Sequence, residues 1–293
     1  MMARVLVMAC IGAIAPAPML AQDVPTPQVL SHLRWQSEDE RLQRFTAIHT
    51  DDGAEVLLLN DLGVLARGRL ERGRDGQITG VDTRAIRYLR DPEGVPLTGP
   101  WRNAQGLAAG RDGRIFVSFE GFGRVWSYAA PDAPASTLPV HQDFSRLTVG
   151  AGLSALAISR SGVLYAVPER AARMTHGIPS YHFWNGEWVG SFRLPTDGQF
   201  HPVGADIGPD GRLYLLERAR GPEGLRMQLR RFVLQGSRID AGTVVMRSAG
   251  GQFGELSGVS VWQAGNGALR ALMTSYTRAP QRTTAIVEVA LPR

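Results

Sequence analysis

The chain has 293 residues, of which 44% are hydrophobic and 20% are charged. This composition excludes a disordered chain, and the length suits one large domain or two small ones. The formal net charge is +5 and every basic residue is arginine, which either serves anion recognition or reflects the codon usage of the genome. The arginines lack the interleaved aromatic residues of a nucleic-acid platform, so we expect no nucleic-acid partner.

Residues 1–21 have the pattern of a secretory signal, with a basic start to Arg4, an apolar stretch and a small-residue exit that ends at Ala21. A lipoprotein signal with Cys10 as the lipidated residue would leave an apolar stretch of only about five residues, short of the usual 7–15. No later stretch approaches the about 20 apolar residues that span a membrane. We therefore expect a periplasmic or secreted mature chain, residues 22–293, without a membrane span. Cys10 is the only cysteine, so this chain would have no disulfide.

Short β-prone segments alternate with turns along the mature chain, after a Pro-containing lead-in up to residue 36. The predicted strands cover residues 45–49, 56–59, 64–70, 78–81, 85–89, 106–108, 115–119, 125–128, 152–157, 163–167, 203–207, 213–216, 229–234, 256–261, 269–274 and 285–291, with a hairpin over 183–194 around Asn185-Gly186. Residues 37–45 are the one weak helix candidate. The Asp112-Gly113 pair between apolar runs predicts a type I′ hairpin turn.

The major turns recur at a regular distance. They fall at Asp52, Asp112, Ser161, Asp210 and Asn266, which are 60, 49, 49 and 56 residues apart. A period near 50 with about four strands in each unit favours an all-β propeller of five or six blades, formed by a single domain over residues 22–293. A β-sandwich is the alternative, but it explains the long period less well.

Several motifs resemble the phytase-like β-propeller family, which is described as "esterase-like activity of phytase". They include the residues 60–63 (NDLG), 118–121 (SFEG), 124–126 (RVW), 213–218 (LYLLER) and 281–283 (QRT). The resemblance runs from about Phe45 to Pro292. It implies a secreted propeller hydrolase that holds phosphate through a calcium cluster.

The chain departs from this family where an acid is typical of the strand that enters each blade. Gln105, Ser154 and Ser257 stand at three such sites, and Asp206 keeps the acid of another. The resemblance therefore implies a central channel with fewer negative charges. Calcium prefers several carboxylate oxygens, so we expect it to bind only if the remaining acids converge.

The candidate ligand-binding set lies at or near strand ends. It consists of Asp61, Gln105, Glu120, Arg124, Asp206, Glu217, Arg218 and Arg282. The acids, with Glu169, could converge at one mouth of the propeller, or they could cap turns and form surface ion pairs. The arginines could bind a phosphate or carboxylate, or they could form ion pairs between blades. No catalytic residue and no metal site are assigned.

Other side chains have weaker patterns. Ser154 lacks the second glycine and the following helix of a nucleophile elbow, which favours a structural serine. His201, near Asp206, is the histidine to test first. Trp126 is expected in the core, whereas Trp184 and Trp188 flank a polar turn and are expected to be more exposed.

Two functions follow from these patterns. The first is a monomeric propeller that binds a small anionic ligand or a periplasmic partner, with weak or lost hydrolase activity. The alternative is an active hydrolase of phosphate or carboxylic esters.

Overall fold

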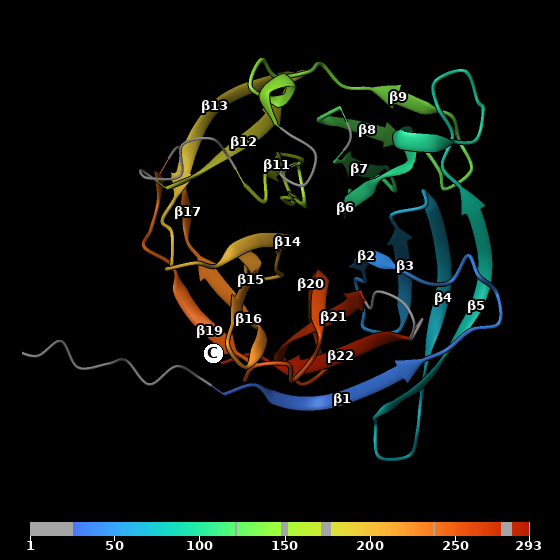
Figure 1. Cartoon of the computed structure of the whole chain (residues 1–293), viewed down its shortest axis with the longest axis vertical. Coiled ribbons are helices and arrows are strands. Elements are labelled where there is room, and N and C mark those ends of the chain that lie inside the picture. The colour runs from blue at the N-terminus through green and yellow to red at the C-terminus, as the bar shows by residue number, and fades with distance from the viewer. Residues whose placement is uncertain are drawn as a thin grey trace, which may run out of the picture.

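The computed structural model describes residues 26–120, 122–147, 152–170, 177–236, 238–276 and 283–292. Five sheets of four antiparallel strands lie in a ring, with a separate two-stranded sheet beside them (Figure 1). This arrangement confirms the predicted β-propeller and sets its size at five blades. No helix in these described ranges is long and apolar enough to cross a membrane.

Blades one to three follow one another along the chain. Blade one contains β2 (Phe45–His49), β3 (Glu55–Asn60), β4 (Val64–Arg72) and β5 (Ile78–Tyr88). Blade two contains β6 (Ala104–Ala109), β7 (Ile115–Phe119), β8 (Arg124–Tyr128) and β9 (Ala135–Thr137). Blade three contains β10 (Ala155–Ile158), β11 (Leu164–Val167), β12 (Ile178–Trp184) and β13 (Glu187–Leu194). The short 3-10 helices are η1 (Gly99–Arg102) and η2 (Phe144–Arg146).

The last two blades complete the ring. Blade four contains β14 (His201–Ile207), β15 (Leu213–Gly221), β16 (Gly224–Phe232) and β19 (Thr243–Arg247), and the small sheet pairs β17 (Leu234–Gln235) with β18 (Arg238–Ile239). Blade five contains β20 (Glu255–Gln263), β21 (Leu269–Tyr276), β22 (Thr284–Ala290) and β1 (Gln28–Trp35). β1 pairs antiparallel with β22, from Gln28 opposite Ala290 to Trp35 opposite Thr284. The segment read from sequence as a lead-in is therefore the outer strand that joins the two ends of the ring.

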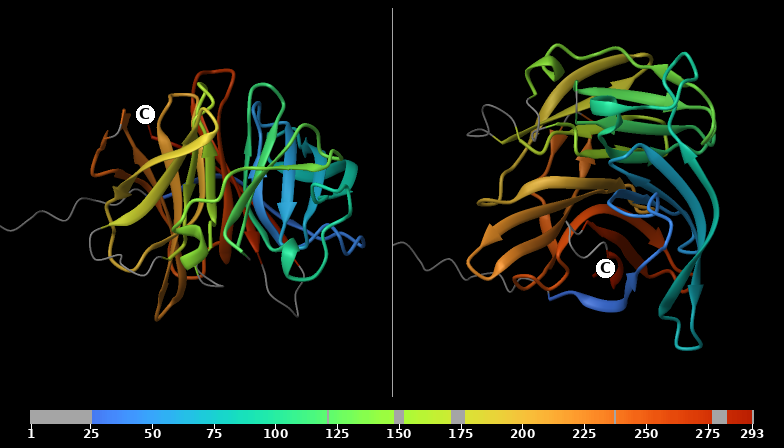
Figure 2. Two further views of the ribbon diagram at one scale, coloured as in Figure 1. Left: turned by 90° about the horizontal axis from the view of Figure 1, so that it is seen from above. Right: turned by 45° about the vertical axis from the view of Figure 1, so that its right-hand side comes forward.

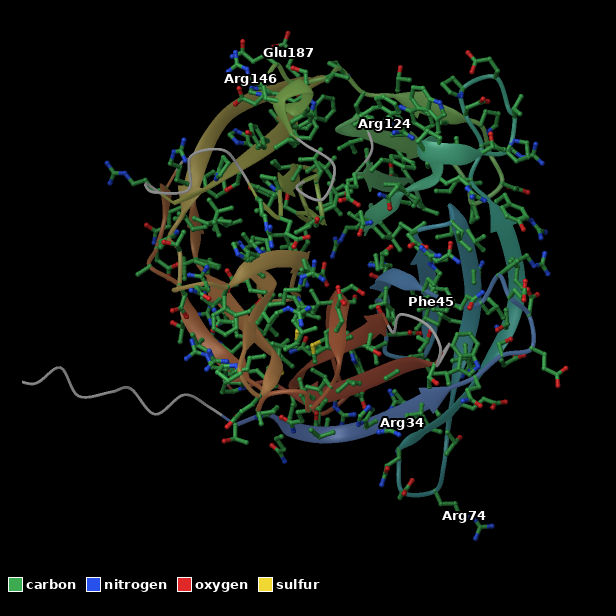
Figure 3. All side chains as sticks on the ribbon, in the orientation of Figure 1. Arg34, Phe45, Arg74, Arg124, Arg146 and Glu187 are labelled. Carbon is green, nitrogen blue, oxygen red and sulfur yellow. The ribbon has the colours of Figure 1, made fainter. Side chains whose placement is uncertain are left out.

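The innermost strands β2, β6, β10, β14 and β20 contact one another around the ring, whereas the long β4–β5 hairpin projects from it (Figures 1 and 2). Figure 3 shows Arg74 at the tip of this hairpin, away from the blades. Glycines allow the inner strands to approach closely. A Cβ atom on Gly258 would lie 2.6 Å from the Cα of Ala47 in the next blade. Such a distance is too short for any side chain, so glycine is required where blades five and one meet.

The predicted turns occur, but the Asp-Gly turn has a different form. Gly113 has a φ of 81°, whereas Asp112 is not among the described non-glycine residues with positive φ. Gly110 N donates to Arg114 O at 2.8 Å, which closes a three-residue loop. The type I′ prediction is therefore wrong for this turn, because that type needs positive φ at both central residues. The turn at Asn185-Gly186 meets the requirement, with φ values of 50° and 84°.

Apolar side chains fill the space between neighbouring blades. Phe45 and Leu58 of blade one share a cluster with Trp262, Leu272 and Ile286 of blade five. Each blade has a neighbouring blade on either side, so its strands are covered on both faces. This double burial explains their nearly continuous apolar runs. Trp126 is buried, as expected from its strand position, and so is Trp262, whereas Trp184 is exposed.

Candidate functional site

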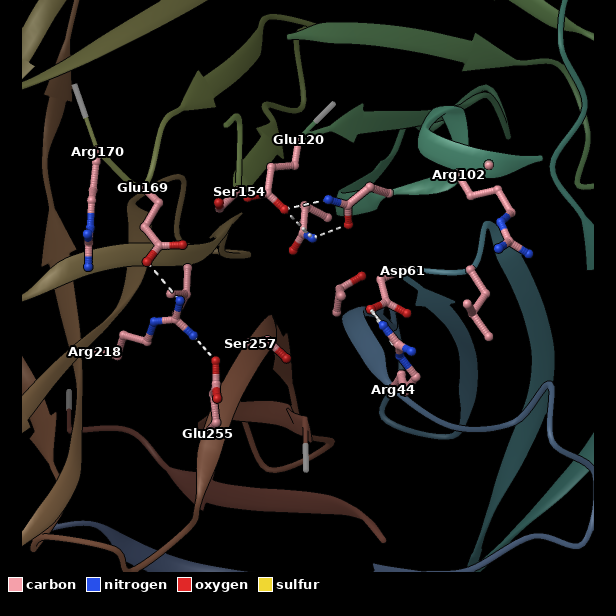
Figure 4. A pocket seen from close by; sticks show the side chains of 16 residues that line it. Arg44, Asp61, Arg102, Glu120, Ser154, Glu169, Arg170, Arg218, Glu255 and Ser257 are labelled. Carbon is pink, nitrogen blue, oxygen red and sulfur yellow. Dashed lines mark hydrogen bonds and ion pairs between the residues drawn. The ribbon is translucent and has the colours of Figure 1, made fainter. Parts of the chain in front are cut away.

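A cavity of about 770 Å³ opens at the end of the channel where the inner strands begin. Every blade contributes residues to it, and four acids and four arginines dominate its lining (Figure 4). The charged residues are Arg44, Asp61, Arg102, Glu120, Glu169, Arg170, Arg218 and Glu255. Because all inner strands run in the same direction, equivalent positions of different blades meet here. We refer to this cavity as the channel mouth.

One set of equivalent positions comes from irregular pairing of the inner strands. The register shifts at Thr46, Gln105, Val203 and Ser257, and each of these residues lines the channel mouth. A bulge turns its side chain out of the regular alternation of a strand. Ser154, directly before β10, is the corresponding residue of blade three. None of these five residues carries a charge.

A second set of equivalent positions follows the second strand of each blade. Glu120 N donates to Asn103 O at 2.9 Å, and Glu169 N donates to Gly152 O at 3.0 Å, both at the blade entry. Asp61 N has the same relation to Arg44 O, at 3.5 Å. In blade four, Arg218 lies opposite the entry residue His201. Three blades thus place an acid at this position, and blade four places an arginine there.

Arg218 lies between two of the acids. Its Nη2 contacts Glu169 Oε1 at 2.7 Å, and its Nη1 forms an ion pair with Glu255 Oε1 (Figure 4). Burial alone would lower the pKa of Arg218, but the two carboxylates raise it above its ordinary value. The guanidinium therefore stays charged and pairs with one carboxylate each from blades three and five.

Glu120 is bound by side-chain amides instead of a cation. Asn103 Nδ2 donates to Glu120 Oε2 at 2.5 Å, and Gln105 Nε2 donates to the same oxygen at 3.3 Å. Gln105 Nε2 also donates to Asn103 Oδ1 at 2.9 Å. Gln105, which stands where the resemblance implies an acid, and Asn103 are thus both hydrogen-bond donors to Glu120.

Asp61 pairs with Arg44, whose Nε lies 3.0 Å from Asp61 Oδ2. Burial raises the pKa of Asp61, although Arg44 and then Arg102 partly offset this effect. Its other oxygen, Oδ1, is buried and has no hydrogen-bond partner among the described residues. Asp61 therefore prefers a nearby positive charge, which Arg44 and Arg102 supply.

Arg102 and Arg170 are the cations of the channel mouth that remain available. Neither forms a hydrogen bond or an ion pair with any residue in the described ranges. The Nε of Arg102 is buried and without a partner there. Figure 4 shows the two side chains on opposite sides of the cavity. A guanidinium binds phosphate or carboxylate through two parallel hydrogen bonds, so both residues can receive an anion.

The channel mouth contains hydroxyl groups, but these serve the packing of blades. Ser257 Oγ donates to Phe45 O at 3.0 Å, and Thr46 Oγ1 donates to Ala104 O at 3.0 Å, so both join neighbouring blades. Ser154 Oγ donates to Gly152 O at 3.4 Å within its own blade. Nucleophilic catalysis needs a base within hydrogen-bond reach of the hydroxyl, and Ser154 has no such contact with a described side chain.

The structure brings together four of the eight predicted ligand residues, Asp61, Gln105, Glu120 and Arg218. Glu217 instead points into blade four, where Arg230 Nε donates to it at 2.6 Å and Gln228 Nε2 donates at 2.9 Å. Burial raises the pKa of Glu217 despite these donors. Glu217 therefore forms a buried structural ion pair with Arg230 and does not line the channel mouth.

Arg124 is also enclosed by protein. Its guanidinium carbon lies 4.0 Å from the ring centre of Phe119 and 4.4 Å from that of Trp126. Nη2 donates to Trp101 O at 2.5 Å. Arg282 lies outside the described residues.

Asp206 lies near the opposite end of the channel, in a second cavity of about 410 Å³ with His49 and Asp51. Val261 N donates to Asp206 Oδ2 at 2.7 Å. The bulge register makes Val203, not Asp206, the equivalent of Gln105, so blade four has no acid at its entry site. The prediction that Asp206 keeps the acid of this entry site is therefore wrong, because Asp206 lies three residues beyond the bulge, near the end of β14.

His201 lines a neighbouring cavity of about 370 Å³ with Arg170 and Arg218. Burial, together with Arg170, lowers the pKa of His201 and favours its neutral form. Four charged residues of the channel mouth were absent from the predicted set: Arg44, Arg102, Arg170 and Glu255. Their common signal is position, since each lies at a strand end or within three residues of one, and none belongs to a recognisable motif.

The donor chemistry of the channel mouth does not fit calcium. Calcium takes six to eight oxygen ligands, mostly from carboxylates and carbonyls. Glu169 and Glu255 share the Arg218 cation, Asp61 pairs with Arg44, and no group of three or more His, Cys, Asp or Glu in the described ranges could hold a metal ion. A cation that entered would have to displace arginine.

Comparisons with known proteins found similar solved structures and one family. Solved structures with similar folds include virginiamycin B lyase from Staphylococcus aureus, at 13% identity, with 88% of this chain and 73% of that chain covered and a TM-score of 0.43. A protein of unknown function from Dyadobacter fermentans has 12% identity, covers 84% of this chain and 76% of its own, and has a TM-score of 0.49. The calcium-binding protein regucalcin from Agrobacterium tumefaciens has 12% identity, coverages of 85% and 77%, and a TM-score of 0.45.

No curated protein matches the chain. The phytase-like family, described as "Esterase-like activity of phytase", matches residues 40–273, which is most of the chain and all but the last and first strands of the ring. The protein therefore belongs to the phytase-like family of β-propellers.

Proposed function

We propose that this phytase-like propeller binds a small anionic ligand at the channel mouth and has weak or lost hydrolase activity. The observation that carries this proposal is the state of the charges. The acids there are already bound by arginines or amides of the chain, whereas Arg102 and Arg170 have no such partner among the described residues.

The pairing of the charged groups, and not their sum, favours an anion over a cation. With all acids ionised, the four acids and four arginines of the channel mouth cancel. Arg44 and Arg218 are engaged, so the cations that face open space are Arg102 and Arg170. A phosphate or carboxylate that bound there would gain charge-assisted hydrogen bonds, which are about twice as strong as those between neutral groups.

Binding of inorganic phosphate tests this proposal. We expect phosphate to raise the melting temperature of the protein at low ionic strength, because a ligand that binds only the native state stabilises it. The double variant Arg102→Met/Arg170→Met should lose this rise. Arg114→Met removes an exposed arginine away from the channel mouth and should keep it. An equal rise in all three proteins would show that phosphate acts elsewhere.

An active ester hydrolase is the second candidate, and family membership favours it. It predicts turnover of phytate, p-nitrophenyl phosphate or p-nitrophenyl acetate, stimulated by calcium. Glu120 is the acid of the channel mouth without a cationic partner, so Glu120→Gln is the variant that tests catalysis. We expect the native protein to show no turnover above that of Glu120→Gln. Calcium-stimulated turnover that depends on Glu120 would establish the hydrolase instead.

We also propose that residues 1–21 direct export and that the mature protein is a periplasmic or secreted monomer. Support comes from the sequence pattern of this segment alone. Mass spectrometry of the protein from a cell fraction tests the export, with a mature start at Gln22 as the expected result. Light scattering of the purified protein tests the monomer.

A further inference from the structure

Two exposed aromatic side chains are close in sequence to residues that line the channel mouth. Trp101 is 47% exposed and Phe122 is 64% exposed, and their rings stack with centroids 4.5 Å apart and planes 25° apart. We call this pair the aromatic rim. Most tryptophan and phenylalanine side chains are largely buried. A stacked pair in which both rings face solvent is therefore unusual for residues that only pack the core.

The aromatic rim adjoins the cavity through the chain. Trp101 belongs to η1, whose first and last residues, Gly99 and Arg102, line the channel mouth. Phe122 follows two residues after Glu120, which lines it from the same blade. The arginine that is free to receive an anion is thus the direct neighbour of an exposed tryptophan.

The backbone of Phe122 is strained, which favours a role for its ring. Its φ is 59°, in the left-handed region where residues other than glycine are disfavoured. Glycine would fit this conformation without strain and would expose no apolar ring to water. Such strain in a folded protein tends to occur at ligand sites.

Arg124 fixes the other half of the aromatic rim. Its guanidinium carbon lies 5.0 Å from the ring centre of Trp101, and its Nη2 donates to Trp101 O. Burial lowers the pKa of Arg124 to about 10, which shows how far this group is removed from water. A buried cation that holds both the ring and the carbonyl of Trp101 makes Arg124 a positioning residue for the aromatic rim.

We propose that the ligand of the channel mouth is an anion that carries a planar ring, of the aryl phosphate or aryl carboxylate class. Arg102 binds its anionic group and the aromatic rim stacks on its ring. This inference rests on the proposed anion binding at the same mouth. Stacking of a ligand ring on an aromatic side chain increases affinity by about tenfold. This gain requires a planar ring but no particular substituents on it.

Two probes separate the ring from the anion. Phenyl phosphate and methyl phosphate carry the same anionic group, and only the first has an aromatic ring. We expect phenyl phosphate to have a dissociation constant about tenfold lower for the native sequence, measured by isothermal titration calorimetry. Arg102→Met should weaken both probes by a similar factor.

Variants of the aromatic rim should remove only the preference for the ring. Trp101→Ala and Phe122→Gly should bring the two dissociation constants to within about twofold, with that of methyl phosphate unchanged. Phe122→Gly also relieves the strained φ, so it keeps the fold while it removes the ring. Trp184→Ala removes an exposed tryptophan of blade three and should leave the preference intact.

The outcomes distinguish this inference from the proposed function. If neither probe binds, the anion-binding function fails and the ring preference with it. If both bind equally through Arg102, the function stands and the inference is overturned. A preference for phenyl phosphate that survives Trp101→Ala and Phe122→Gly also overturns the inference. Self-association of the native protein that these variants abolish overturns it as well, since the aromatic rim would then be a contact between copies.

Discussion

Arg218 takes the place that a metal ion would occupy between carboxylates, and its removal tests this interpretation. Methionine at residue 218 keeps most of the side-chain volume and removes the cation. Glu169 and Glu255, from blades three and five, would then face each other without a positive charge between them. We expect Arg218→Met to destabilise the protein in the absence of calcium and to acquire calcium binding.

The magnitude follows from the burial of the ion pairs. Arg218 contacts two carboxylates while its side chain is 24% exposed. Exposed pairs contribute about 0.2–1 kcal/mol each, and removal of one partner from a buried pair costs about 3–5 kcal/mol. This partly buried site lies between these limits, at about 2–3 kcal/mol for the loss of the cation. For a domain of this size, that free energy lowers the melting temperature by about 4–10 °C.

Calcium should restore part of this loss in the variant alone. Extracellular calcium sites have dissociation constants of about 0.1–1 mM, so 10 mM calcium would return about 1.4–2.7 kcal/mol. Thermal melting with and without calcium, at matched ionic strength, measures the effect. Arg220→Met, an exposed arginine on the same face of β15, is the matched control and should show neither change.

Two results would refute this reasoning. The first is an Arg218→Met protein as stable as the native protein, since the ion pairs would then contribute nothing. The second is equal stabilisation of both proteins by calcium, which would show that calcium binds elsewhere or displaces Arg218 freely. Addition of Glu255→Gln to the variant should abolish its calcium response, which ties any response to this site.

Three further predictions concern the scaffold. Glu217→Ala leaves the buried Arg230 without its carboxylate and should cost about 3–5 kcal/mol in urea unfolding, whereas a loss below about 1 kcal/mol would contradict a buried pair. Burial raises the pKa of Asp206 from 3.8 to about 6, so the folded state binds more protons than the unfolded state between these pH values. The free energy of unfolding therefore falls by up to about 3 kcal/mol as pH rises through this range. Asp206→Asn should be more stable than the native protein at pH 7, and its melting temperature should depend less on pH. Gly258→Ala places a methyl group 2.6 Å from the Cα of Ala47 and should lower the melting temperature by several degrees, and an unchanged value would show that blades five and one can separate.

The inner and second strands of each blade were predictable because they combine apolar runs with a glycine turn. β7 (Ile115–Phe119) agrees with its prediction at both ends, and β2 (Phe45–His49) does as well. Three of the five outer strands, β1, β9 and β19, were not predicted. β9 has only three residues, and β1 pairs with a strand more than 240 residues away, so no local pattern marks either one. The weak helix candidate at residues 37–45 is wrong, since it forms turns that lead into β2.

The site was predictable at the level of motifs and not at the level of register. The SFEG motif and its relatives placed Glu120 and Asp61 correctly just after a strand, whereas Arg218 lies within one. Nothing in a motif shows which side of a strand a residue faces. Glu217 and Arg218 are adjacent, and their side chains point to opposite faces, one into the blade and one into the channel mouth. The position of the bulge likewise makes Val203, three residues before Asp206, the equivalent of Gln105.

The replacement of acids and the arrangement of arginines are two aspects of one charge balance. A ring of carboxylates without a counter-ion would repel itself, because like charges this close destabilise a fold. Blade four answers this by placing Arg218 where blades one to three place an acid, so the chain supplies its own cation. The four acids and four arginines of the channel mouth cancel in number, but the acids are bound by Arg44, Arg218 and two amides, whereas Arg102 and Arg170 have no such partner among the described residues. The arrangement of partners, and not a net positive charge, is therefore what leaves two guanidinium groups for an anion.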